Sequence, residues 1–145
     1  MATMYQPSYA RGDACKPRIL FVEDNDISRE LIRRIFQRMK HLEAHVAKDG
    51  SEALQFYDAH PYDIIFMDLQ MPVMDGFEVT REIRNRDQLR GTYTPIVAVT
   101  AYVGDGDREM CKEAGMDGFL SKPINTDDLL QKIQQYIPCF ETRSS

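Results

Sequence analysis

The chain lacks the features that would place it in a membrane or on a nucleic acid. No apolar stretch among its 145 residues approaches the roughly 18 residues that a membrane helix requires. Its formal net charge of -5 argues against a nucleic-acid surface, which needs a basic stripe. The N-terminal region has no basic start followed by an apolar run, so we expect no secretory signal. We therefore predict no membrane and no nucleic-acid partner, and a cytoplasmic location, or a nuclear one in a eukaryote.

Cysteine and histidine are also scarce, with 3 of each in the chain. Cys15, Cys111 and Cys139 are widely spaced and match neither a disulfide framework nor a zinc-binding pattern. We therefore expect reduced thiols, which are usual in a cytosolic or nuclear protein. The histidines lie near predicted helix ends and a predicted edge strand, away from any acidic cluster, and we interpret them as surface residues. They are His41, His45 and His60.

Several short apolar runs, in contrast, each stop at a residue that can bind a metal ion or phosphate. These runs are Ile19–Val22 before Glu23 and Asp24, Ile64–Met67 before Asp68, Ile96–Val99 before Thr100, and Phe119–Ser121 before Lys122. Continuous apolar runs are typical of buried parallel strands. Open α/β sheets place their working residues just beyond the carboxyl ends of such strands. We therefore expect these carboxylates, the hydroxyl and the ammonium group to converge on one edge of a sheet.

Strand and helix patterns alternate along residues 17–138, which predicts βαβ units and a parallel sheet in one domain. Residues 1–16 show no period and are predicted to be a poorly ordered extension, and residues 139–145 a C-terminal tail. The strand from Leu42 to Ala47 is predicted near an edge, because polar and apolar residues alternate in it.

Helical spacing predicts the elements between these strands. Apolar residues from Ile27 through Leu31 to Met39 are expected to form the inward face of the first helix, capped by Asp26 or Ser28. A helix over 77–86 follows the third strand. Gly115 is expected to end the helix over 105–114 in the left-handed conformation. Asn125 or Thr126 is the expected cap of the last helix.

The acidic residues have ordinary explanations when each is considered alone. Asp68 is of a type that often forms turns or caps helices, and Glu23 and Asp24 suit a solvated helix entrance. Together, however, they repel, because two unit charges about 4 Å apart cost on the order of 4 kcal/mol in a partly screened site. Such a pocket is stable if a cation fills it, and all-oxygen ligands favour Mg²⁺ or Mn²⁺ over zinc.

Thr100 and Lys122 indicate a functional site only when they are considered together. A threonine at a strand end often satisfies a backbone group, and lysine is most often a surface residue. Opposite a metal-bound carboxylate, however, a hydroxyl and an ammonium group are what a phosphoryl group needs. Pro123 restrains the loop after Lys122, with the trans peptide favoured over the cis form.

The segments Glu23–Asn25, Asp68–Gly76, Thr100–Ala101 and Ser121–Pro123, in this order and spacing, resemble the receiver domain of two-component response regulators. The motifs are most similar to those of receivers in hybrid histidine kinases and phosphorelay proteins. The resemblance spans Arg18 to Ile137 and implies an α/β fold, a flavodoxin-like doubly wound (βα)5 sandwich. It implies a five-stranded parallel sheet in the order 2-1-3-4-5.

The resemblance also assigns roles to individual residues. Asp68 would be the phosphoacceptor and the centre of the site. The other implied roles are metal binding by Asp24, Asp68, the Gln70 backbone carbonyl and Glu23 (through water), phosphoryl contact by Thr100 and Lys122, switching by Thr100 and Phe119, tuning of phosphoryl lifetime by Gln70 and Tyr102, and loop geometry set by Pro72, Gly76 and Pro123.

The implied function is that of a signalling phosphoacceptor and not of a conventional enzyme. A histidine kinase or histidine phosphotransfer protein would supply the phosphoryl group, with Mg²⁺ as cofactor. The protein would catalyse its own phosphotransfer and slow autodephosphorylation. An effector would dock on the fourth helix, fifth strand and fifth helix. The chain is either free-standing or part of a longer protein such as a hybrid histidine kinase.

Two other functions remain open from the sequence. Residues Asp24–Ser28 read D-x-D-x-S after an apolar strand, as in aspartate-nucleophile phosphatases, with Asp24 as the nucleophile. Against this function, Asp127 and Asp128 open an amphipathic helix instead of following a strand, and Asp68 is left unexplained. The other alternative is an interaction module of the same fold that is never phosphorylated, against which the complete acidic set and Lys122 argue.

Overall fold

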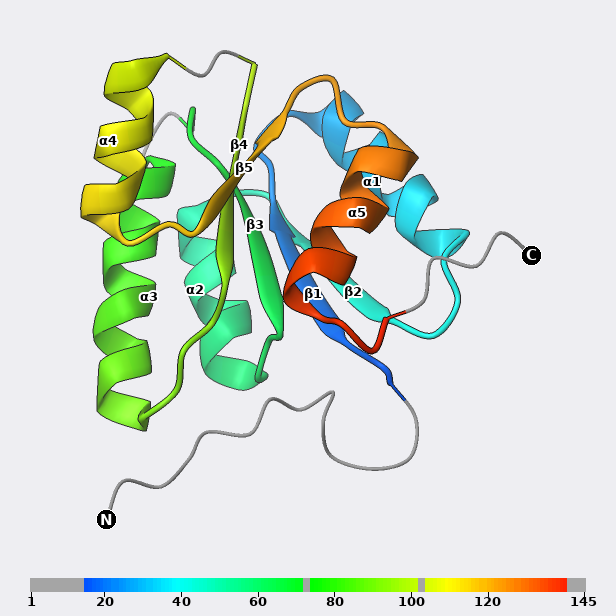
Figure 1. Ribbon diagram of the computed structural model, residues 1–145, viewed down its shortest axis with the longest axis horizontal. Coiled ribbons are helices and arrows are strands. Elements are labelled where there is room, and N and C mark those ends of the chain that lie inside the picture. The colour runs from blue at the N-terminus through cyan, green and yellow to red at the C-terminus, as the bar shows by residue number, and fades with distance from the viewer. Residues whose placement is uncertain (1–14, 72–73, 102–103, 141–145) are drawn as a thin grey trace.

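A five-stranded parallel sheet forms the centre of the molecule. The computed structural model describes residues 15–71, 74–101 and 104–140. The strands are β1 (Arg18–Val22), β2 (Glu43–Ala47), β3 (Ile64–Asp68), β4 (Ile96–Thr100) and β5 (Gly118–Ser121), in the spatial order β2-β1-β3-β4-β5 (Figure 1). The predicted parallel sheet, its order and the edge position of β2 are confirmed.

Helices cover both faces of this sheet. They are α1 (Asp26–Gln37), α2 (Gly50–Ala59), α3 (Gly76–Arg90), α4 (Asp105–Ala114) and α5 (Thr126–Tyr136). Figure 1 shows α1 and α5 on one face and α2, α3 and α4 on the other. The fold is the flavodoxin-like doubly wound sandwich that the sequence predicted.

The core has two halves because side chains alternate across each strand. In β1, Leu20 and Val22 belong to the cluster beneath α2, α3 and α4, whereas Ile19 and Phe21 belong to the cluster beneath α1 and α5. The Phe21 ring stacks on that of Phe66 from β3, with the centroids 5.4 Å apart. This two-sided burial makes the central strands rigid supports for the residues that follow them.

Side chains and glycines fix the ends of the helices. The predicted cap of α5 is confirmed, since the Asn125 side chain accepts a hydrogen bond from the Asp128 backbone N–H. Gly115 ends α4 at φ 100°, as predicted. The predicted caps of α1, Asp26 or Ser28, were wrong, because the cap is Asn25, which has the extended conformation and accepts from the Ser28 N–H.

Two helix predictions need correction. The inward face of α1 consists of Ile32, Ile35 and Phe36, whereas Ile27 and Leu31 are 82% and 50% exposed. Ile27 and Leu31 are four residues apart and lie on a neighbouring line of the helix surface. Helix α3 extends to Arg90 instead of ending at Arg86. The buried residue of its last turn is Asp87. A helix pattern predicts an apolar residue at such a position, so this turn was missed.

Three local predictions also differ from the structure. Cys15 and Cys139 form a disulfide with Cα atoms 5.8 Å apart, because the segment before β1 and the segment after α5 meet. The prediction of reduced thiols therefore holds only for Cys111, which is buried. The Lys122–Pro123 peptide is cis. His45 is partly buried, since its ring stacks on Phe56.

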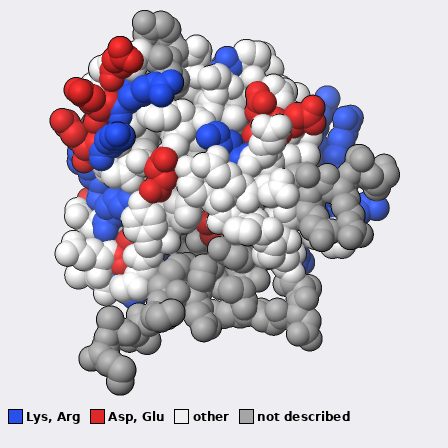
Figure 2. Space-filling view, viewed as in Figure 1, with Lys and Arg blue, Asp and Glu red and all other residues white. Residues whose placement is uncertain are grey.

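The described surface carries charges of both signs. On the face shown in Figure 2, acidic and basic side chains are interleaved on the side of α3 and α4. Among the described residues, no helix combines the length and the apolar character needed to cross a bilayer.

Candidate functional site

The carboxyl ends of β1 and β3 bring three carboxylates together. The strands are neighbours, with Val22 paired to Met67, so the residues that follow β1 lie beside the end of β3. Glu23, Asp24 and Asp68 each place one carboxylate oxygen within 4.8 Å of the others. Glu23 and Asp68 are each 1% exposed, and Asp24 is partly exposed at the mouth of the site. The convergence expected from the sequence is therefore present.

Lys122 reaches the same cluster from the carboxyl end of another strand. It follows β5, which is separated from β3 by β4. Its Nζ atom lies 3.1 Å from Glu23 Oε1 and 3.4 Å from Asp68 Oδ2. The ammonium group therefore bridges two buried carboxylates whose residues are far apart in the sequence.

Burial and mutual repulsion set the protonation of this cluster. Burial raises the pKa of Asp68, and contact with Glu23 raises it further, while the Gln70 N–H and Lys122 oppose the rise. Burial acts to raise the pKa of Glu23 too, but contact with Asp68 and with the Lys122 ammonium group lowers it overall. Burial acts to lower the pKa of Lys122, which the two carboxylates nevertheless raise. These shifts favour the charged form of Lys122 and disfavour the ionised form of Asp68.

One atom of the cluster has no hydrogen bond. Asp68 Oδ1 accepts from the Gln70 backbone N–H at 3.0 Å. Asp68 Oδ2 is buried and has no hydrogen-bond partner among the described residues, although its 3.4 Å contact with Lys122 is an ion pair. A buried oxygen without a hydrogen bond is costly unless another group compensates it. The orphaned oxygen and the surrounding carboxylates fit a hard divalent cation that keeps some of its waters.

Thr100 ends β4, the strand between β3 and β5, and Phe119 lies on β5, three residues before Lys122. Thr100 is 5% exposed, and its backbone carbonyl accepts from the Lys122 N–H at 2.9 Å. Phe119 on β5 is partly buried, and the guanidinium of Arg108 from α4 lies 5.3 Å from its ring centroid. The structure therefore brings Thr100 to the edge where Asp68 and Lys122 meet.

Gly76 allows α3 to begin directly against the end of β3. A Cβ atom at Gly76 would lie 2.4 Å from the Asp68 carbonyl oxygen, a separation that no side chain tolerates. The Asp75 side chain caps α3 by accepting from the Glu78 N–H at 2.9 Å. Pro72 and Tyr102, the other two predicted site residues of these loops, lie outside the described residues.

Arg29 is a neighbour of the site that the sequence analysis did not identify. Its guanidinium donates to the backbone carbonyls of Glu23 and Asp24. An arginine in the first turn of an amphipathic helix reads as a solvated surface residue. The only available signal was its position a few residues after the acidic pair.

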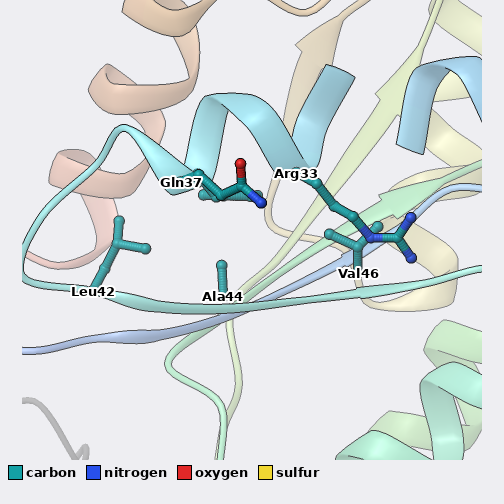
Figure 3. A pocket seen from close by; sticks show the side chains of 6 residues that line it. Arg33, Gln37, Leu42, Ala44 and Val46 are labelled. Atoms are coloured by element: carbon teal, nitrogen blue, oxygen red, sulfur yellow. The ribbon is translucent and has the colours of Figure 1, made fainter. Parts of the chain in front are cut away.

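A separate hollow lies between α1 and the edge strand β2. Figure 3 shows that the side chains lining it come from the C-terminal half of α1 and from the segment that contains β2. These residues are Arg33, Phe36, Gln37, Leu42, Ala44 and Val46. None of the three clustered carboxylates lines this hollow.

Comparisons with known proteins agree with this geometry. Residues 19–134 match the response regulator receiver domain family. The chain is 38% identical over 135 residues to hybrid signal transduction histidine kinase I of Dictyostelium discoideum, covering 88% of this chain but 8% of the kinase. It is 34% identical over 119 residues to the polar-differentiation response regulator DivK of Brucella anthropi, covering 82% of this chain and 94% of DivK.

Solved structures show the same similarity. The Ssk1 receiver domain, co-crystallised with the histidine phosphotransfer protein Ypd1 of Saccharomyces cerevisiae, matches with a TM-score of 0.79 and 30% identity, over 85% of this chain and 90% of that one. A sensor histidine kinase receiver from Pseudomonas aeruginosa, with magnesium coordinated in its active site cleft, matches with a TM-score of 0.74 and 36% identity, over 85% and 98%. The chain belongs to the response regulator receiver domain family of phosphorelay signalling proteins.

Proposed function

We propose that Asp68 accepts a phosphoryl group from a phosphohistidine and that the chain signals through the resulting change of charge. The observation that carries this proposal is the buried Asp68 carboxylate, which has one oxygen without a hydrogen bond and lies between two further acids and Lys122. Receiver family membership supports the same assignment.

The transfer would be an in-line displacement at phosphorus. An oxygen of the ionised Asp68 carboxylate forms the new P–O bond while the P–N bond to the donor histidine breaks, and the electron pair of that bond returns to the imidazole nitrogen. Such reactions depend mainly on positioning and on neutralisation of charge. Burial and Glu23 disfavour the ionised form of Asp68, whereas Lys122 and the Gln70 N–H favour it.

Asp24, Asp68 and the Gln70 carbonyl would hold Mg²⁺, or Mn²⁺, directly, and Glu23 would act through water. When bound, the ion would neutralise charge on the transferring phosphoryl oxygens. The acidic cluster and the magnesium-containing receiver from Pseudomonas aeruginosa support this cofactor. Lys122 and Thr100 would contact the transferred group from the opposite side of Asp68.

The phosphoryl group would add about -1.5 to -2 charges beside Lys122 and Thr100. Movement of these two residues toward it would draw Phe119 inward and alter the surface of α4, β5 and α5, where we propose that an effector docks. A complete two-state switch requires about 5.5 kcal/mol of differential stabilisation. Gln70 and Tyr102 would tune the lifetime of the phosphoryl group, and slow autodephosphorylation would end the signal.

The phosphodonor would be a histidine kinase or a histidine phosphotransfer protein. Ile27 and Leu31 are exposed apolar residues on α1, which begins just beyond Glu23 and Asp24. An apolar pair beside the acceptor suits a docking partner that must bring its histidine to Asp68. The Ypd1–Ssk1 receiver complex supports this class of donor. We propose a location in the cytoplasm, or in the nucleus of a eukaryote, where the Cys15–Cys139 disulfide would be an uncommon feature.

Incubation with a small phosphodonor and Mg²⁺, followed by intact mass measurement and peptide mapping, tests the proposal. We expect one acyl phosphate, mapped to Asp68 and absent from the Asp68→Asn variant. An adduct on Asp24 would instead identify an aspartate-nucleophile phosphatase. A protein that neither gains mass nor responds to beryllofluoride with Mg²⁺ would be an interaction module that is never phosphorylated.

A further inference from the structure

Arg29 holds the short connection that carries two of the three clustered carboxylates. One nitrogen of its guanidinium donates to the Asp24 carbonyl at 2.8 Å and to the Glu23 carbonyl at 3.2 Å. The other terminal nitrogen pairs with the Asp26 carboxylate. The Arg29 side chain is only 13% exposed, so its head is fixed against the loop and does not extend into solvent.

The other hydrogen bonds of the Glu23–Asn25 connection involve groups other than the Asp24 carbonyl. The Glu23 N–H donates to the Ala47 carbonyl at 3.0 Å, which ties the loop to β2. The Asn25 side chain and carbonyl accept from α1 at 2.9 Å each. Two groups therefore hold the peptide plane between Asp24 and Asn25: Arg29 donates to its carbonyl, and its Asn25 N–H donates to the Glu23 carboxylate.

The two peptide planes that flank Asp24 set the direction of its Cα–Cβ bond, and Arg29 donates to the carbonyls of both. Glu23 and Asp68 are buried and contact Lys122, so their carboxylates have further restraints. Asp24 is partly exposed, and packing restrains it less. Backbone hydrogen bonds at Asp24 therefore affect the position of its carboxylate more than similar bonds would at Glu23 or Asp68.

We propose that Arg29 is a positioning residue that presents the Asp24 carboxylate to the divalent cation. This inference rests on the proposed function, because it takes the acidic cluster to be a cation site. Two effects of Arg29 oppose each other in sign. Its positive charge would repel a cation, whereas its hydrogen bonds preorganise the ligands. The geometry makes positioning dominant, since the guanidinium faces the two carbonyls and is neutralised by Asp26.

The test measures the affinity of the folded protein for Mg²⁺ alone by isothermal titration calorimetry, without phosphodonor and at constant ionic strength. We expect Arg29→Gln to weaken binding about tenfold, the lower end of the effect of losing an outer partner of a metal ligand. Arg29→Lys keeps the charge but not the forked donor, so it should restore only part of the affinity. Arg34→Ala is the control, because Arg34 lies on the same helix, its side chain is 69% exposed, and within the described part of the chain its ion pair is with Glu30.

A second readout separates positioning from mere loss of stability. We expect amide hydrogen exchange at residues 24–26 to accelerate in Arg29→Gln and not in Arg34→Ala. At saturating Mg²⁺ the variant should regain the wild-type rate of phosphorylation. Equal or tighter Mg²⁺ binding by folded Arg29→Gln would overturn the inference while leaving the proposed function intact. Failure of the wild type to bind Mg²⁺ would overturn both.

Discussion

Two buried aspartates in this molecule have opposite surroundings. Asp87 on α3 accepts hydrogen bonds from Tyr57, from the Thr92 hydroxyl, and from both the N–H and the hydroxyl of Thr94, and it pairs with Arg84. Asp68 is as deeply buried, yet one of its oxygens has no hydrogen bond and its other neighbours include two acids.

The difference separates a structural carboxylate from a reactive one. Every donor around Asp87 lowers the cost of its charge and fixes it in place. Around Asp68, one carboxylate oxygen stays available to a metal ion or a phosphorus atom. The Glu23 and Asp24 carboxylates nearby repel its charge. Burial alone does not distinguish the two residues, whereas the count of satisfied oxygens does.

The largest expected effect comes from replacing Asp68. Asp68→Asn should lose all phosphoryl acceptance, because an amide oxygen is a poor nucleophile and the variant has one metal ligand fewer. Its stability without Mg²⁺ should not fall, since the new amide can still accept from the Gln70 N–H and no longer repels Glu23. Intact mass and thermal unfolding measure the two properties. A marked loss of stability would show that Asp68 is structural after all.

Asp87→Ala should show the reverse pattern. Removing Asp87 leaves the buried donors of Tyr57 and Thr94 without their acceptor and takes one of the two paired carboxylates from Arg84, so we expect about 3–5 kcal/mol less free energy of unfolding. Urea denaturation measures this loss. Well below its transition, the folded variant should still accept a phosphoryl group at Asp68. Asp58→Ala, at an exposed ion pair with Arg86, is the control and should change stability little.

Magnesium should stabilise only proteins with an intact acidic cluster. At a Mg²⁺ concentration about ten times its Kd, the wild type should gain about 1.4 kcal/mol, because the ion binds the folded state. The gain should vanish in Asp24→Asn and Asp68→Asn but persist in Asp87→Asn. Thermal unfolding with and without EDTA tests this. A gain retained in Asp24→Asn would place the ion elsewhere.

The smallest effect is expected at His45, on the edge strand. Burial lowers the pKa of His45, assisted by the charges of His60 and Arg18 and opposed by Glu43. The unfolded chain therefore binds more protons than the folded one just below the usual histidine pKa of about 6.5, so stability should decline as pH falls through that value. His45→Gln should flatten this slope, whereas His41→Asn, at an exposed residue, should not. An unchanged slope in His45→Gln would contradict the expectation.

The sequence predicted the sheet because its strands are short apolar runs with turn or helix signals between them. It predicted the acidic edge because parallel strands end together, and Glu23, Asp68 and Lys122 each follow such a run. Contacts that depend on three-dimensional detail were missed. The Cys15–Cys139 disulfide joins residues 124 positions apart, and Arg29 acts on backbone carbonyls that no sequence pattern displays.

The disulfide also determines where attached segments can leave the domain. Cys15 precedes the amino end of β1, and Cys139 follows α5, which runs back toward that end of the sheet (Figure 1). The bond therefore sits at the pole opposite Asp68, a full strand length from the acidic edge. The two ends of the described domain are thus tied together at this pole, away from the face around Asp68 that an incoming histidine must reach.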